Sequence, residues 1–551
     1  MNCKVYTFVL VLLLVASRLY VQPVYSLISD CDETFNYWEP LNLLLRGFGK
    51  QTWEYSPEYS IRSWAFLLPF YGVLYPIKAF AEIQANWNFY VVRASLGLLS
   101  LVLEWKVFKE ITSTMTLEIA NLWLLYQIFN PGWFHASVEL LPSAGAMILQ
   151  LGSINYALKY LSTGSTSNFI GSVSFNFIAG ILGWPFVLIL NLPLCFHYLI
   201  NHRLISTVRT VFDCSLIFCL ISTIVIGIDS LLYGKFAPVA WNIFFYNVLN
   251  ADESAGPNIF GTEPFSYYIQ NLILNFPFPT LFFAIIGITH WRLWPLWGSM
   301  ITWFTIFAAQ PHKEERFLYP IYAYISLSAA ISSYKILKFW KKHLPLAKLV
   351  KFSIISLVIL QATSRIYALV NNYTAPMDVY STLFDRETNS DDRINVCTGR
   401  EWYHFPNSFY LPDSHRLKFT KSAFDGLLPG DFLEDESIFT KIRSIPEGMN
   451  NQNLFDESKL WPLEDCDYFV DVVLESVDNE DAFNPETKEQ ISWNKVECSK
   501  FINSEKSKIL GRTFYIPKFV DHTLQKHLPK VWNKVHHSEY NEYCLYEKVA
   551  V

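Results

Sequence analysis

Apolar runs long enough to cross a bilayer recur through the first two-thirds of this 551-residue chain. A transmembrane helix needs about 20 mostly apolar residues, because every backbone polar group must be satisfied inside the lipid. The composition agrees, since 52% of the residues are hydrophobic and only 17% are charged, where about a quarter is usual. The fold class predicted for this part is therefore an all-α polytopic membrane bundle.

The spans can be placed from the runs themselves. Residues 169–200 are too long for one span, and GWPF at 183–186 is a candidate tip of a helical hairpin. Residues 64–80 are interrupted by Pro69 and Pro76 and remain ambiguous. A cleaved signal peptide is an alternative for the first run. The total is about 11–12 spans, and the remaining candidates are 5–28, 88–105, 115–133, 143–160, 211–233, 267–288, 293–310, 318–338 and 347–370.

Basic residues cluster at 106–109, 202–209, 290–294 and 338–343. The positive-inside rule places such clusters in the cytosol. The chain then divides into a transmembrane module, 1–370, and a C-terminal lumenal domain, 371–551. The loops that face the lumen in this topology are 28–63, 134–142, 234–266 and 311–317.

The C-terminal domain is polar, and its alternating segments at 466–474, 512–520 and 542–549 predict short strands. We expect a small mixed α/β domain. Asn372 begins an N-x-T sequon and is a candidate glycosylation site. Four cysteines are candidates for one or two disulfides in an oxidising lumen, with all three complete pairings open and free buried thiols as the alternative. These are Cys397, Cys466, Cys498 and Cys544.

The loop after the first span carries two adjacent carboxylates, Asp32 and Glu33, and ends at Arg62. Aromatic residues surround them, including Trp38 and Trp53. A carboxylate can take a proton from a sugar hydroxyl, and aromatic faces suit sugar rings. The simpler interpretation is a solvated loop with aromatic side chains at the membrane interface.

Two later loops on the same predicted side also hold polar residues. Residues 129–143 contain His135 and Glu139, and residues 310–320 pack five ionisable side chains between two apolar runs. Arg can bind phosphate with two parallel hydrogen bonds, and Lys or His adds charge. The dense cluster therefore predicts a site for the phosphate of a lipid-linked donor, with an interfacial anchor as the alternative. Together with the carboxylates, it has the minimum chemistry for glycosyl transfer from a lipid phosphate.

Other function classes have little support. The chain has no basic tract for nucleic acid, no phosphate-binding glycine loop, no CxxC and no HExxH. No residue cluster requires a metal or another cofactor, so we expect neither, although Asp32 and Glu33 could help to bind an ion.

Four segments taken in order closely resemble glycosyltransferase family 22: SDCDETFNYWEP, QTWEYSPEYSIRSWAF, FHASVELLPS and HKEERFLYPIY. CTGREWYHFPNSFYLP resembles the branch of that family that adds alpha-1,2 mannose in N-glycan precursor assembly. The resemblance implies a C-superfamily glycosyltransferase fold in the endoplasmic reticulum membrane. It also implies dolichyl phosphate mannose as donor and a dolichyl-diphosphate-linked oligosaccharide as acceptor, with mannose added to two branches by an inverting displacement.

The resemblance also assigns roles. Asp32 is expected to be the base, with Glu33 orienting it or the acceptor. The expected donor-phosphate ligands are His312, Lys313, Arg316 and Arg62. The weaker candidates for sugar contacts are Trp38, Trp53, Glu54, His135, Glu139 and Glu315.

Three alternatives stay open at this point. The first is a sibling enzyme, either an alpha-1,6-mannosyltransferase or a glycolipid-anchor mannosyltransferase. The second is a polytopic lipid or sugar transporter, although the charges collect in loops on one face and no internal repeat is found. The third is a non-catalytic assembly subunit.

Overall fold

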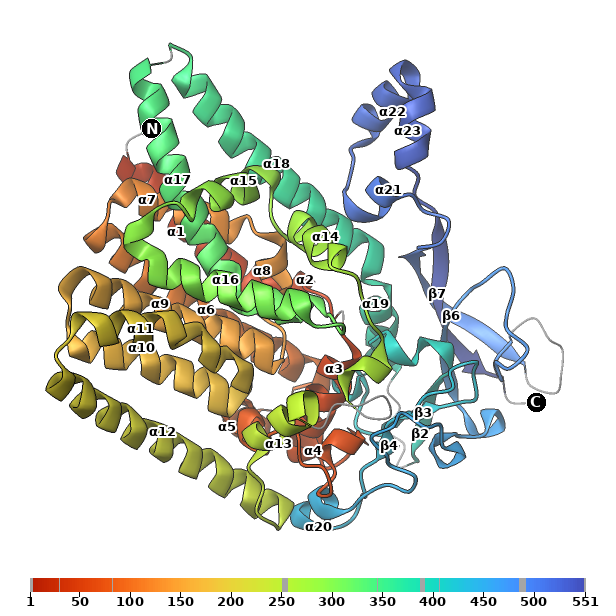
Figure 1. The fold of residues 1–551 in the computed structure, drawn as a ribbon. Coiled ribbons are helices and arrows are strands. Elements are labelled where there is room, and N and C mark those ends of the chain that lie inside the picture. The colour runs from red at the N-terminus through yellow and green to blue at the C-terminus, as the bar shows by residue number, and fades with distance from the viewer. Residues whose placement is uncertain are drawn as a thin grey trace.

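The apolar runs fold into a helical bundle, and the chain after it forms a small sheet beside the bundle (Figure 1). This arrangement comes from a computed structural model. The structure describes residues 3–28, 30–81, 83–249, 256–343, 345–386, 392–405, 407–484 and 492–549. Part of the predicted loop 234–266 therefore lies outside the described residues.

The bundle is built from helices of very different length. Its helices are α1 (Cys3–Ala16), α2 (Gln22–Tyr25), α5 (Trp64–Phe80), α6 (Ala85–Thr114), α7 (Leu117–Ile128), α8 (Pro131–Ala136), α9 (Pro142–Thr163), α10 (Thr166–Ile178), α11 (Leu192–Asn201), α12 (Leu204–Tyr233), α13 (Val239–Phe244), α14 (Ser266–Asn275), α15 (Phe278–Gly287), α16 (Trp294–Ala309), α17 (Tyr322–His343) and α18 (Ala347–Tyr373).

Within the described ranges, three helical segments are long and apolar enough to cross a membrane by length and composition, namely Lys4–Tyr25, Leu204–Tyr233 and Ala347–Tyr373. The predicted span 267–288 consists of two helices, α14 and α15, which together are long and apolar enough to be one broken span but meet at 114°. Pro277 and Pro279 stand at that break, where proline removes a backbone donor and ends the helix. Counting the bent pair as one span gives up to four among the described residues, so the total of 11–12 stays a prediction.

The two ambiguous regions have clear structures. Residues 64–80 form one helix, α5, with both prolines inside it. The region 169–200 is a helical hairpin, as predicted, because Phe169 near the start of α10 stacks on Tyr198 near the end of α11, with ring centroids 4.2 Å apart. The helical path is interrupted at Trp184, where the backbone becomes extended.

The segment between the first span and α5 lies between the bundle and the sheet (Figure 1). It contains α3 (Cys31–Glu33), α4 (Glu39–Arg46) and β1 (Lys50–Gln51). The two residues of β1 pair antiparallel with β4 (Gly430–Asp431). Glu39 also accepts hydrogen bonds from the backbone N and the Oγ of Ser408, at 2.7 and 2.8 Å. The first loop is thus fastened to the C-terminal part by backbone and side-chain contacts.

The C-terminal part contains a five-stranded mixed sheet in the order β3-β2-β5-β7-β6. The β2 strand pairs parallel with β3 and β5, and β7 pairs antiparallel with β5 and β6. The elements are α19 (Ala375–Ser381), β2 (Ile394–Thr398), β3 (His415–Phe419), β4, α20 (Ile438–Arg443), β5 (Tyr468–Val472), β6 (Trp493–Ile502), α21 (Ile509–Thr513), α22 (Lys518–His527), α23 (Pro529–Val535) and β7 (Tyr540–Lys548).

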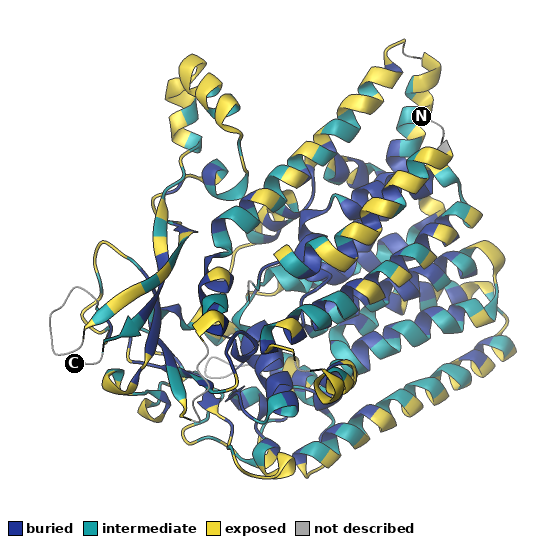
Figure 2. Ribbon diagram, turned by 180° about the vertical axis from the view of Figure 1, so that it is seen from behind, coloured by how far each residue is buried: buried dark blue, intermediate teal, exposed yellow. Residues whose placement is uncertain are grey.

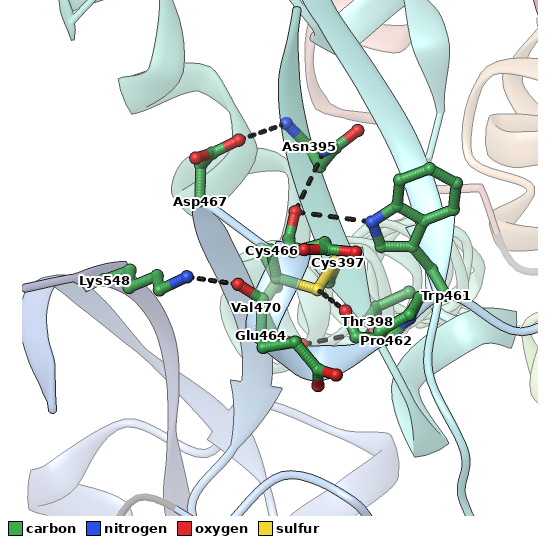
Figure 3. Close-up of a disulfide and its surroundings, with 11 residues drawn as sticks. Asn395, Cys397, Thr398, Trp461, Pro462, Glu464, Cys466, Asp467, Val470 and Lys548 are labelled. Atoms are coloured by element: carbon green, nitrogen blue, oxygen red, sulfur yellow. Dashed lines mark hydrogen bonds between the residues drawn. A yellow bond between two sulfur atoms is a disulfide. The ribbon is translucent and has the colours of Figure 1, made fainter. Parts of the chain in front are cut away.

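The four C-terminal cysteines form two disulfides inside this sheet. Cys397 of β2 is bonded to Cys466, just before β5, with Cα atoms 5.9 Å apart. Figure 3 shows this bond among hydrogen-bonded neighbours, where Asn395 of β2 donates its backbone N–H to Asp467 at 2.8 Å. Cys498 and Cys544 stand directly opposite each other on β6 and β7. Both bonds hold neighbouring strands of one sheet together.

The candidate glycosylation site needs a correction. Asn372 is only 2% exposed, near the end of α18. Its amide nitrogen donates to the carbonyl of Arg512 at 3.2 Å, and its oxygen accepts from Tyr540 at 2.9 Å. A glycosylated asparagine needs a surface position, so the folded protein leaves no room for a glycan there.

Candidate active site

A cavity of about 1380 Å³ lies where the first loop meets the bundle and the C-terminal part. Its lining comes from segments far apart in the sequence. The ionisable lining residues outside the C-terminal part are Asp30, Cys31, Asp32, Tyr37, Glu54, Arg62, His135, Tyr246, Glu263, Tyr267, His312, Lys313, Glu314, Glu315, Arg316, Tyr319, Arg365 and Tyr373. The later chain adds mostly aromatic and apolar side chains, including Trp402, Phe405 and Phe424.

The local fold of the first loop decides which carboxylate reaches this cavity. Asp30 caps α3 by accepting the backbone N–H of Asp32 at 2.9 Å. The helical path then continues through residues 34–38 into α4. Successive residues on a helix point about 100° apart. Asp32 consequently lines the cavity, whereas Glu33 is directed into the protein interior.

Asp32 is shared by two guanidinium groups. Its Oδ2 lies 2.7 Å from Nη2 of Arg316 and 3.3 Å from Nη2 of Arg62. The side chain is 28% exposed, and Oδ1 has no hydrogen-bond partner among the residues that the structure describes. One oxygen of this carboxylate is therefore held between two positive charges while the other stays available to a ligand in the cavity.

Each guanidinium has a second acidic partner. Glu54 receives two bonds from Arg62, at 2.7 and 3.1 Å, so it positions Arg62 and has less capacity for a sugar hydroxyl. Arg316 pairs with Asp30 at 3.2 Å and with Glu314. Although burial acts against charge on both arginines, their carboxylate partners raise the pKa of Arg62 and Arg316 well above the ordinary value.

The acidic partners respond differently to burial. Burial raises the pKa of Asp30 to about 7, against the opposite effect of Arg316. Burial also raises the pKa of Glu54, despite its contact with Arg62. For Glu314, Arg316 and His312 outweigh the effect of burial and lower the pKa to about 2. Asp30 is thus one member of this network that changes charge near neutral pH.

His312 and Lys313 line the cavity, but their polar atoms are hydrogen-bonded to the protein itself, which is not what we expected of phosphate ligands. Both ring nitrogens of His312 face acceptors, the carbonyl of Gly261 and the carboxylate of Glu314, each at 2.7 Å. Although burial disfavours its charge, these hydrogen bonds raise its pKa. The Lys313 ammonium donates to three backbone carbonyls, including that of Glu263 at 2.7 Å. Lys313 therefore secures its own loop and is not free for a phosphate.

Three predicted site residues are buried away from the cavity, which corrects their assignments. Glu33 is fully buried and accepts the indole N–H of Trp38 and the backbone N–H of Leu140, both at 2.9 Å. Trp38 itself is fully buried against Phe89. Glu139 is 1% exposed and accepts from Tyr319 at 3.2 Å. These side chains hold the loops together and are not among the residues that line the cavity.

The remaining predicted residues do line the cavity. His135 bonds Ser26 through Nδ1 at 3.2 Å, and burial lowers its pKa to about 3, so the ring is neutral. Glu315 accepts from Asn275 at 2.8 Å, and burial raises its pKa. Trp53 stands between the rings of Tyr59 and Tyr246.

Sequence reasoning missed Asp30 and the aromatic residues near Trp402. Asp is a favoured N-cap residue, so Asp30 could have been recognised as the cap of the helix that carries Asp32. Trp402 stacks on Phe424, with ring centroids 4.5 Å apart. It lies in the CTGREWYHFP segment, which was quoted for the resemblance and not for a site.

Asp30, Cys31 and Asp32 place potential metal-ligand atoms within 4.8 Å of one another. In the structure, Arg316 contacts both carboxylates of this group and already supplies a positive charge between them. A phosphate group could bind Arg316 and Arg62 where the carboxylates now do, because both arginines present N–H donors beside an open cavity.

The model of the Alg9-like mannosyltransferase family matches residues 9–412. Alpha-1,2-mannosyltransferase ALG9 of Saccharomyces cerevisiae is 60% identical, over 100% of this chain and 99% of its own length. The human alpha-1,2-mannosyltransferase ALG9 is 34% identical, over 90% of this chain and 84% of its own length. Among solved structures, ArnT from Cupriavidus metallidurans in the apo state has a TM-score of 0.51 at 13% identity, covering 76% of this chain and 86% of that one. This likeness shows a shared fold of the helical bundle.

Proposed function

The chain belongs to the Alg9-like mannosyltransferase family and is an alpha-1,2-mannosyltransferase, and on this premise we propose how its cavity carries out the transfer. The proposed donor is dolichyl phosphate mannose, and the proposed acceptor is a dolichyl-diphosphate-linked oligosaccharide. The cavity would open to the lumen of the endoplasmic reticulum, on the side where α18 leads into the C-terminal part. The relatives favour neither the alpha-1,6 sibling nor a transporter.

Arg316 and Arg62 bind the donor phosphate in this proposal. Both carry several N–H donors at the cavity and both remain charged at any physiological pH. The lining beside Arg316 includes Trp184, Phe307 and Phe317. The centroids of their rings lie 5.4 to 5.5 Å apart. This apolar wall suits the lipid chain that continues from the phosphate into the bundle.

Asp32 is the general base, and the observation that carries this assignment is the unequal use of its two oxygens. Oδ2 is held by Arg316 and Arg62, which orients the carboxylate, and Oδ1 is available to an acceptor hydroxyl. A bound phosphate would compete for the same guanidinium groups. Oδ2 of Asp32 would then share its two arginine partners with the phosphate when the donor is present.

The transfer is a single displacement at the anomeric carbon of mannose. The acceptor hydroxyl oxygen forms the new bond to that carbon, and the bond to the phosphate oxygen breaks. The hydroxyl proton passes to Asp32, and the electron pair leaves with dolichyl phosphate, whose charge Arg316 and Arg62 stabilise. A beta-linked donor then gives an alpha-linked product.

The test is mannose transfer from a short-chain dolichyl phosphate mannose analogue to a synthetic lipid-linked oligosaccharide, with the linkage of the product determined. Wild type should form an alpha-1,2 bond. Asp32→Asn should lower kcat by about 10³-fold or more, while donor binding stays within about threefold of wild type. A product with another linkage would contradict the acceptor assignment.

Glu33→Gln is the matched control, because a glutamine oxygen can still accept the N–H groups of Trp38 and Leu140. We expect its turnover within about threefold of wild type. Near-normal turnover by Asp32→Asn would remove Asp32 from the role of base. A loss in Glu33→Gln alone would transfer the role to its neighbour.

A further inference from the structure

The connection between β6 and β7 is far longer than the strands require. The strands pair antiparallel up to Ile502 and Tyr540, a geometry that a turn of a few residues can close. Residues 503–539 intervene and contain α21, α22 and α23. The backbone N–H of Lys508 donates to the carbonyl of His537 at 2.9 Å, which joins the two ends of this connection. We call residues 509–537 the β6–β7 insertion, and Figure 1 shows it projecting beyond the sheet.

The β6–β7 insertion takes no part in the cavity. None of its residues is among the lining side chains, and the last of these in the chain is Phe501 of β6. The insertion is thus required neither for strand pairing nor for the site described above.

The insertion is fastened to a membrane-spanning helix. Tyr515 N donates to Ser364 O of α18 at 3.1 Å, and Ser364 Oγ donates back to Tyr515 O at 2.8 Å. Arg365 also donates to Thr513 O at 3.1 Å. The rings of Tyr515 and Tyr367 are 4.4 Å apart. These α18 residues follow its most apolar stretch and precede its end at Tyr373, which is where tyrosines gather at a bilayer surface.

Large apolar side chains are exposed on α22 and α23 and between them, in the part of the insertion that follows this contact. Phe519 is 74% exposed, Val531 63% and Leu528 54%. Figure 2 shows the same two helices as exposed over most of their surface. Soluble domains seldom leave such residues grouped in water, and such groups mark interaction surfaces.

The charge around these residues is positive. The segment from Lys518 to Val535 has four lysines and one aspartate, so its net charge is +3 with histidine neutral, in a chain whose net charge is −6. The aspartate, Asp521, is occupied by the indole N–H of Trp532 at 2.7 Å and by His536. The four lysines are all exposed, namely Lys518, Lys526, Lys530 and Lys534.

We propose that the β6–β7 insertion is a membrane-surface anchor that binds the anionic phospholipid headgroups of the leaflet where α18 ends. Short amphipathic helices bind in this way, with apolar side chains in the headgroup region and lysines at the phosphates. The contact with α18 holds α22 and α23 beside that leaflet. The occupant is a lipid surface, because lysines flank the apolar residues along the chain and the insertion contacts a spanning helix.

The test uses the full-length protein in nanodiscs of phosphatidylcholine, with or without 30% phosphatidylserine. Hydrogen exchange of peptides covering 518–535 should be about fivefold slower with the anionic lipid. About 0.5 M salt should remove most of that difference. Equal exchange in the two lipids would overturn the proposal, as would protection that appears only when an acidic protein is added.

Two variants separate the two parts of the surface. K526E/K530E/K534E should abolish the response to phosphatidylserine, and F519S/V531S should increase exchange in both lipids. The matched control is K421E/L454S, which makes the same kinds of change at exposed positions outside the insertion. Unchanged exchange of the β6 and β7 peptides shows that each variant is folded. A response to phosphatidylserine that survives in the lysine variant would overturn the proposal.

Discussion

The two walls of the cavity differ in chemistry. The lining before residue 377 contains all of its Asp, Glu, Lys and Arg side chains, and the described lining from Met377 onward contains none. The later wall has one histidine, His404, among aromatic and apolar residues such as Trp402 and Phe424. The comparison indicates a division of labour, in which the bundle side supplies charge for the reaction and the C-terminal side supplies faces on which sugar rings can lie.

The charged wall gives the largest expected effect. Arg316→Gln should lower kcat/KM by about 10³-fold, because it removes a donor-phosphate ligand and leaves Asp30, Asp32 and Glu314 without their shared partner. Arg316→Lys should recover little of this, since lysine cannot make the same parallel contacts. Steady-state kinetics with the donor varied measures the change. Arg365→Gln is the control, a cavity arginine that does not contact Asp32, and an equal loss there would argue against a special role for Arg316.

The disulfides that hold the other wall should affect stability next. Cys397→Ser with Cys466→Ser should destabilise the sheet by about 3 kcal/mol, because the bond closes a loop with a sequence separation of 69. The melting temperature measured by intrinsic fluorescence should fall by several degrees. Cys219→Ser changes an exposed free thiol and serves as control. If the two melt alike, the disulfide contributes nothing to the stability of this wall.

A smaller effect is expected from the aromatic wall itself. Trp402→Ala should raise the KM for the acceptor about tenfold with kcat nearly unchanged, because it removes a stacking face without touching the charged network. Acceptor-varied kinetics measures this. Trp461→Ala, a tryptophan that does not line the described cavity, should leave KM unchanged. A fall in kcat with unchanged KM would contradict the division of roles between the two walls.

The smallest effect concerns pH. Burial raises the pKa of Asp30 from 3.8 to about 7, so the side chain is neutral at pH 6 and ionised at pH 8. Ionised Asp30 competes with the donor phosphate for Arg316, and the donor KM should rise about threefold between these pH values. The unfolded chain releases this proton near pH 4, whereas the folded protein keeps it until about pH 7. The free energy of unfolding therefore decreases as pH rises from about 4 to 7.

Asp30→Asn should give a donor KM that is independent of pH over this range. His312 and Glu54 also have raised pKa values, and loss of a proton from either group would also weaken phosphate binding, because ionised Glu54 competes for Arg62. A pH dependence that persists in Asp30→Asn would therefore assign the effect to His312 or Glu54 and not to Asp30.

Much of the site was accessible from the sequence. Local patterns indicated a membrane bundle, strands at 466–474 and 542–549, and the separate segments that contain Asp32, Arg62 and Arg316. The strand predicted at 512–520 was wrong, because this segment runs from α21 into α22. The resemblance joined them into one reaction. The patterns failed where packing decides exposure, as for Trp38 and Glu139, because aromatic and acidic residues in a predicted loop look the same whether they face a cavity or the interior. They failed similarly for Asn372, whose sequon is intact but whose side chain is buried.

The sequence by itself determined that this chain needs a bilayer and that carboxylates and guanidinium groups stand in its loops, because apolar run length and residue type are local properties. Only the tertiary structure placed Asp32 at the cavity and Glu33 in the interior, since a turn of about 100° per residue sends neighbours on one helix into different surroundings. It also brought Arg316 to within 2.7 Å of Asp32, across 284 residues of chain. No local pattern specifies that contact, because it depends on how the bundle closes around the cavity.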